Sequence, residues 1–122
     1  MSGKGKDNAV STLMAGPRLV AFFVDGTGTA SVSGPDADLV TLTDNGTGDY
    51  TLTFATTLQQ TPFVFAPMSH TADVMAAVTT AISTTAVRIK TRTVATSPAA
   101  VDADFQVMML VDMPPSSYLL GA

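Results

Sequence analysis

The sequence predicts an all-β protein, and three features support that prediction. Thr is abundant, and its branched side chain favours strands. All ten acidic residues are Asp, which favours turns and caps, whereas Glu, which favours helices, does not occur. Short apolar segments alternate along the chain with turns rich in Gly, Pro and Asp. Strands of this length and spacing indicate a small antiparallel β-sandwich or a barrel.

The clearest strand pair in the sequence spans residues 41–54. Leu42 is flanked by Thr, and Tyr50, Leu52 and Phe54 alternate with Thr, so these three side chains point to one face. The loop between the strands contains residues that tolerate a positive φ or bond to their own backbone, and it is longer than a two-residue hairpin, which predicts a bulged or open turn. This turn motif consists of Asp44, Asn45, Gly46, Gly48, Asp49 and Tyr50.

The other strands are predicted from apolar runs between turns. Residues 17–25 are almost continuously apolar, so we expect that strand to be buried on both faces. Residues 72–83 fit a helical stripe of Val74, Val78 and Ile82 as well as one face of a strand, and the Thr residues around them favour the strand. The remaining predicted strands are residues 29–33, 39–43, 49–55, 62–66, 87–94 and 105–111.

The composition limits the classes of function that this chain can have. Its 122 residues suffice for one domain, and only 13% are charged, against about 25% in a typical soluble domain. Either much of this weakly charged surface contacts other protein, or the protein is a monomer with a Thr-coated surface. The net charge of −4 argues against general nucleic-acid binding, and no apolar run reaches the roughly 20 residues that span a membrane. The absence of Cys excludes disulfides and thiolate zinc sites.

The chain divides into three predicted parts, which are a flexible arm at 1–16, a β-sandwich domain at 17–113 and an apolar tail at 114–122. The arm is too polar to form a core, but it contains a small apolar cluster that either docks onto a partner or folds back onto the domain. The tail follows two prolines, which cannot extend a central strand. The residues that we predict to dock partners from these parts are Leu13, Met14, Arg18, Tyr118, Leu119 and Leu120.

No catalytic or metal-binding constellation emerges from the sequence, so we predict a protein without enzymatic activity, cofactor or metal. The only histidine, His70, follows Ser69, but neighbouring strand residues point to opposite faces. The acidic turn motif lacks the alternating oxygen ligands and terminal Glu of a helix-loop-helix calcium site. Asp36 and Asp38 stand beside a Gly-Pro turn and are interpreted as solvated turn residues.

One charged constellation stands out. Arg88, Lys90 and Arg92 alternate with Val87 and Ile89, so all three basic side chains lie on one face of the predicted strand. Such a row could bind an acidic protein surface, a glycan or nucleic acid, or it could be a solvated face that prevents edge-to-edge aggregation. The net acidity and the lack of interleaved aromatic residues favour a protein partner over nucleic acid.

The turn motif also resembles a recurrent module of tailed-phage virion proteins, especially the C-terminal domains of tail fibres. Such modules commonly contain a hairpin like residues 43–51, here Thr-Asp-Asn-Gly-Thr-Gly-Asp-Tyr-Thr. A Gly-Thr-Gly-Thr turn at 26–29, a Val-Arg-Ile strand at 87–89 and a closing aliphatic strand at 105–111 follow the same order. The resemblance covers about residues 18–112 and implies a small β-sandwich, which we describe as jelly-roll-like, that forms homotrimers on the virion.

The resemblance leads to two expected functions. A tail fibre normally has a long shaft and an attachment domain ahead of this module, whereas here only a short arm precedes it. We therefore expect a head decoration (cement) protein on the surface of the phage particle, with itself and the major capsid protein or another virion protein as partners. The alternative is a short tail fibre or receptor-binding protein that adsorbs to the host.

Overall fold

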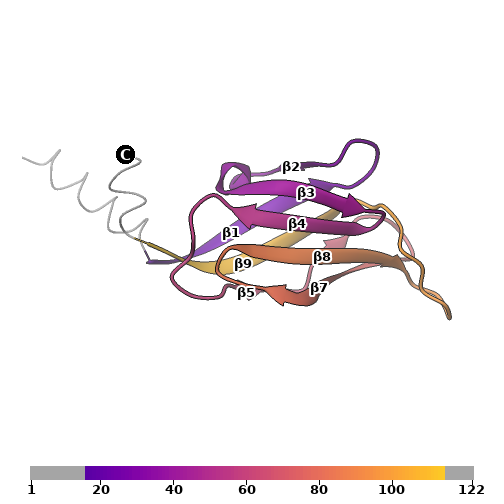
Figure 1. Ribbon diagram of the computed structural model, residues 1–122. Helices are drawn as coiled ribbons and strands as arrows, with labels where there is room; N and C mark the ends of the chain where they lie inside the picture. The colour runs from indigo at the N-terminus through magenta and orange to yellow at the C-terminus, as the bar shows by residue number, and fades with distance from the viewer. Residues whose placement is uncertain (1–15, 115–122) are drawn as a thin grey trace, which may run out of the picture.

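The computed structural model describes residues 16–114, which form two antiparallel β-sheets packed face to face (Figure 1). This confirms the predicted all-β class and is consistent with a small β-sandwich. The helical structure in this part of the chain is a single 3-10 turn, η1 (Ala37–Leu39). No helix among the described residues is long and apolar enough to cross a membrane.

The first sheet has the strand order β2-β1-β9-β5, and the short β6 also pairs with β9. Its strands are β1 (Gly16–Asp25), β2 (Ser31–Ser33), β5 (Phe63–Val64), β6 (Met68–Ser69) and β9 (Phe105–Met113). The second sheet has the order β3-β4-β8-β7. Its strands are β3 (Val40–Gly46), β4 (Asp49–Phe54), β7 (Val74–Ile82) and β8 (Ala86–Thr93). The chain thus places two consecutive strands in one sheet and the next two in the other, and β9 returns to the first sheet to lie beside β1.

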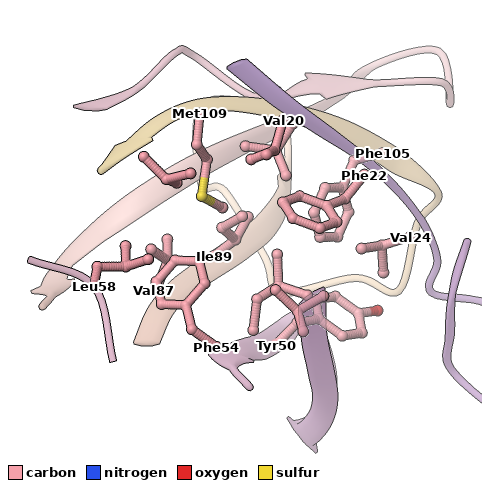
Figure 2. Packing of buried hydrophobic residues seen from close by; sticks show 14 of the residues in the cluster. Val20, Phe22, Val24, Tyr50, Phe54, Leu58, Val87, Ile89, Phe105 and Met109 are labelled. Atoms are coloured by element: carbon pink, nitrogen blue, oxygen red, sulfur yellow. The ribbon is translucent and has the colours of Figure 1, made fainter. Parts of the chain in front are cut away.

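The core lies between the sheets and is formed by alternate residues of their four central strands (Figure 2). Every second side chain points inward because the period of a strand is two. The largest fully buried side chains are Val20 and Val24 from β1, Tyr50 and Leu52 from β4, Val87, Ile89 and Thr91 from β8, and Phe105, Val107, Met109 and Val111 from β9. Leu58, from the segment after β4, closes one end together with Phe54.

Several predictions about single elements are confirmed. The segment at 72–83 forms strand β7, and it pairs with β8 with Val74 opposite Thr93 and Val78 opposite Ile89. The turn between β3 and β4 is bulged, since the register shifts between Asp44 and Gly46. Tyr50, Leu52 and Phe54 all point into the core, as their alternation with Thr predicted.

Other predictions about single elements are wrong. Strand β1 is buried on one face only, because no element covers the outer side of the first sheet among the described residues, and Leu19 is 53% exposed. The predicted strand at 62–66 is a two-residue strand, β5, and the sequence analysis missed β6. Each pairs with β9 over two residues, at Leu110 and Met109 for β5 and at Gln106 and Phe105 for β6.

Candidate functional site

The turn motif joins the two sheets at one end of the sandwich. The Asp44 carboxylate accepts a hydrogen bond from the Gly46 amide at 3.0 Å, and the Asn45 side-chain amide donates to the Thr51 hydroxyl at 2.7 Å. Gly46 and Gly48 both have a positive φ, 130° and 62°. The polar residues of this motif therefore hold the bulged turn, as the sequence analysis interpreted them.

Tyr50 carries the link to the other sheet. Its hydroxyl contacts the Gly26 carbonyl oxygen and the Asp102 carboxylate, each at 3.1 Å, and Asp102 also accepts a hydrogen bond from the Gly48 amide at 2.8 Å. Burial, followed by the hydrogen bond to Asp102, raises the pKa of Tyr50 to about 12. The phenol is thus a neutral structural donor at physiological pH, and it fastens the β1–β2 turn to the segment before β9.

The end of the sandwich formed by the turn motif, Gly26 and Asp102 is called the Tyr50 end. Close packing at this end requires glycine at positions 26 and 48. A Cβ on Gly26 would collide with the Ala103 carbonyl oxygen and the Tyr50 hydroxyl. A Cβ on Gly48 would lie 2.5 Å from the Thr91 carbonyl oxygen and 2.9 Å from the Val101 amide nitrogen. The sequence predicted both glycines to be turn residues. Their contacts with residues 91–103 depend on the tertiary fold, so the local sequence pattern could not predict them.

The basic row, which consists of Arg88, Lys90 and Arg92 in β8, lies on the outer face of the second sheet. Arg88 donates to Asp49 through two nitrogens, at 2.8 Å from Nε and 2.5 Å from Nη2, so it is a bidentate ion pair across β4 and β8. Arg88 holds the pKa of the Asp49 carboxyl below its usual value, and that carboxylate raises the pKa of Arg88. Arg88 therefore has a structural partner in the turn motif, whereas Lys90 and Arg92 lie further along the same face.

Arg18, which was predicted to dock a partner, contacts its own domain. Its Nη2 atom lies 3.0 Å from the Asp36 carboxylate, and the same carboxylate accepts a hydrogen bond from the Ala21 amide at 2.8 Å. Asp36 was interpreted as a solvated turn residue, but it binds the turn before η1 to strand β1. The other predicted docking residues of the arm and tail, which are Leu13, Met14, Tyr118, Leu119 and Leu120, lie outside the described residues.

The described residues show no arrangement that resembles a catalytic or metal centre. Residues 16–114 contain no group of three or more His, Asp or Glu side chains that could hold a metal ion. His70 is exposed, lies 3.1 Å from the Gln106 side-chain oxygen and packs against the edge of the Phe23 ring. The apolar cavity at the Leu58 end, lined by Val20, Phe54 and Met113 among others, has a volume of about 20 Å³, enough for about one water molecule.

The surface that the sequence analysis missed is the outer face of the first sheet. It carries a cluster of exposed apolar side chains, which we call the apolar face. Its members and their exposed fractions are Leu19 53%, Phe63 75%, Phe65 48%, Met68 61%, Met108 42% and Leu110 40%. The apolar run at 17–25 was the available signal, but it was interpreted as a strand covered on both sides.

Strand pairing brings the apolar face together. Leu110 of β9 lies opposite Leu19 of β1 on one side and opposite Phe63 of β5 on the other. In the next row, Met108 lies opposite Ala21, and its carbonyl oxygen accepts a hydrogen bond from the Phe65 amide at 2.9 Å. These side chains therefore form contiguous rows across three neighbouring segments instead of scattered exposed residues.

Comparison with protein-family models, with curated proteins and with solved structures finds no match for this chain.

Proposed function

We propose that this protein is a non-enzymatic structural protein of a tailed-phage particle, which binds the head surface as a homotrimer and stabilises the shell. The observation that carries the proposal is the apolar face, because an exposed, contiguous apolar patch on a small domain is typical of a surface that binds protein. The polar groups that could have indicated chemistry, such as Tyr50 and Asp49, are used in structural contacts.

The assignment to a phage particle rests on the order of the modules in the sequence. The turn at 26–29, the turn motif and the strand at 87–89 follow one another along the chain as in tail-fibre modules. A jelly-roll-like description of the sandwich belongs to the same proposal, and the return of β9 to lie beside β1 supports it, since Greek-key folds return their last strand beside the first. In this proposal, the arm and the apolar tail dock onto the capsid protein and bridge neighbouring subunits.

The proposal is tested by adding the purified protein to phage heads that lack it. We expect the protein to co-sediment with the heads in amounts that scale with the capsid protein, and to increase the fraction of heads that retain DNA after heating. Leu119→Asp in the tail is expected to reduce binding. Thr41→Asp in β3, an exposed position outside the predicted docking residues, serves as the control. Absence of the protein from purified heads, or a copy number like that of a tail fibre, would contradict the proposal.

The alternative function, host adsorption, gives the opposite result in a second assay. A receptor-binding protein would bind host cells in isolated form, and substitution of Arg88 or Arg92 would block that binding. Arg88 is already paired with Asp49, so the structure leaves it fewer free donors for a receptor. Binding to cells without binding to heads would replace the proposed function by the alternative.

A further inference from the structure

The apolar face is large enough to form a specific interface. Its six side chains are between 40% and 75% exposed. With a full surface of about 200 Å² for each such side chain, the face offers roughly 600 Å² of apolar area. That is at the upper end of the ~300–600 Å² of the largest patch on a typical monomer, and it approaches the ~800 Å² that each partner contributes to a standard interface.

The apolar face is also free of charge at its centre. The rows that contain Leu19, Met108 and Met68 include no charged residue. Their polar members are Gln106 and, at the β2 edge of the sheet, Ser33, both in the row of Met68. At the outward-facing positions of β1 and β9, the nearest charges are acidic, at Asp25 and Asp104 beyond one end and Asp112 beyond the other. Arg18, next to Leu19, alternates to the opposite face of β1 and is paired with Asp36. A partner with the same uncharged surface can therefore cover this face without the cost of desolvating a charge.

We infer that the apolar face is the surface through which this chain binds a second copy of itself. Each copy presents the same uncharged face of similar area, and a closed symmetric assembly covers this face on every copy. Two such sheets can pack with their side chains interdigitated, as the inner faces of a sandwich do. An anionic lipid surface fits less well, because the charges that flank the face are acidic. This inference identifies the surface that holds copies together, and it does not depend on the number of copies given in the proposed function.

Two substitutions of the same residue type test the inference in the full-length protein. Met108 in β9 lies in the centre of the apolar face, and Met75 in β7 lies on the outer face of the second sheet, and both are 42% exposed. Since both side chains point to solvent in a single copy, Met108→Lys and Met75→Lys are expected to fold. Sedimentation velocity over a range of concentrations then gives the mass and the dissociation constant of each protein.

We expect the wild type to self-associate, Met108→Lys to weaken association by about tenfold or more, and Met75→Lys to leave it unchanged. A wild type that is monomeric at high concentration would overturn the inference, as would equal effects of the two substitutions. Loss of association with Leu13→Lys but not with Met108→Lys would assign the contact to the arm and would also overturn it. A dimer that Met108→Lys dissociates would support the inference and contradict only the trimer of the proposed function.

Discussion

The Tyr50 end of the sandwich and the apolar face of the first sheet both use residue types outside their usual roles. The Tyr50 end is rich in Asp, Asn and Tyr, residue types that often bind ions or substrates, yet here they hold the backbone of the fold. The apolar face is formed by Leu, Met and Phe, residue types that usually fill a core, yet here they are exposed. Polar residues can thus be structural and apolar residues available for binding, and only the tertiary contacts distinguish the two cases.

This comparison makes a clear prediction. Substitutions at the Tyr50 end should lower the stability of a single copy without affecting association. Substitutions on the apolar face should weaken association without lowering the stability of a single copy.

The largest effect on stability is expected from Gly48→Ala. The new Cβ would lie 2.5 Å from the Thr91 carbonyl oxygen, and φ at this position is +62°. Strain and steric overlap together should lower the free energy of unfolding by about 3 kcal/mol or more, measured by chemical denaturation. Gly28→Ala is the matched control, since φ there is +63° but no atom lies within 4 Å of the new Cβ, and it should cost only about 1 kcal/mol. Equal costs at the two sites would show that the Tyr50 end is loosely packed.

The second prediction concerns the pH dependence of stability. Because the pKa of Tyr50 is raised to about 12 in the folded protein, against about 10 in an unfolded chain, the unfolded state loses its proton first as pH rises. Stability should therefore be unaffected by this group below pH ~10 and should fall by up to about 3 kcal/mol between pH ~10 and ~12.

Tyrosinate absorbance measures this titration directly. A Tyr118→Phe protein leaves Tyr50 as the only tyrosine that reports, and Tyr50→Phe should abolish the alkaline loss of stability that this group causes. If Tyr50 titrated at its ordinary pKa in the folded Tyr118→Phe protein, the buried hydroxyl would not be held as described.

The fold was more predictable from the sequence than the surfaces were. Strand positions follow from local alternation, so Tyr50, Leu52 and Phe54 were correctly placed on one face. The contacts of Tyr50 with Gly26 and Asp102 join residues 24 and 52 positions apart, and no local pattern encodes them.

The exposure of the apolar face was unpredictable for a different reason. A run such as 17–25 has the same sequence whether a second layer covers it or not. The apolar residues around Leu19 therefore predicted a buried position for it. In the fold, the second sheet covers only the inner face of the first sheet, so Leu19 on the outer face is exposed. The local sequence pattern predicts to which face of a strand a side chain points, but the arrangement of the sheets determines what that side chain contacts.

A smaller effect is expected at the ion pair on the outer face of the second sheet. The Arg88 side chain is exposed, so Arg88→Gln should lower the free energy of unfolding only slightly at neutral pH. Because the pKa of Asp49 is held below its usual value, this contribution is present at neutral pH and is lost as pH falls through the pKa of the folded state. Lys90→Gln, which removes one positive charge from the same strand, is the control in urea denaturation. A loss with Lys90→Gln as large as with Arg88→Gln would attribute the effect to net charge.

The smallest effect on the stability of a single copy is expected from Phe63→Ser on the apolar face. Phe63 is 75% exposed, so its removal should change the free energy of unfolding of the dilute protein by no more than about 0.5 kcal/mol. Its effect should appear instead in the concentration dependence of the melting temperature. Association stabilises the folded state by mass action, so the wild type should melt at a higher temperature as its concentration rises, and Phe63→Ser should flatten that dependence. If the variant melted at a much lower temperature even when dilute, Phe63 would support the fold of a single copy, and the contrast between the apolar face and the Tyr50 end would fail.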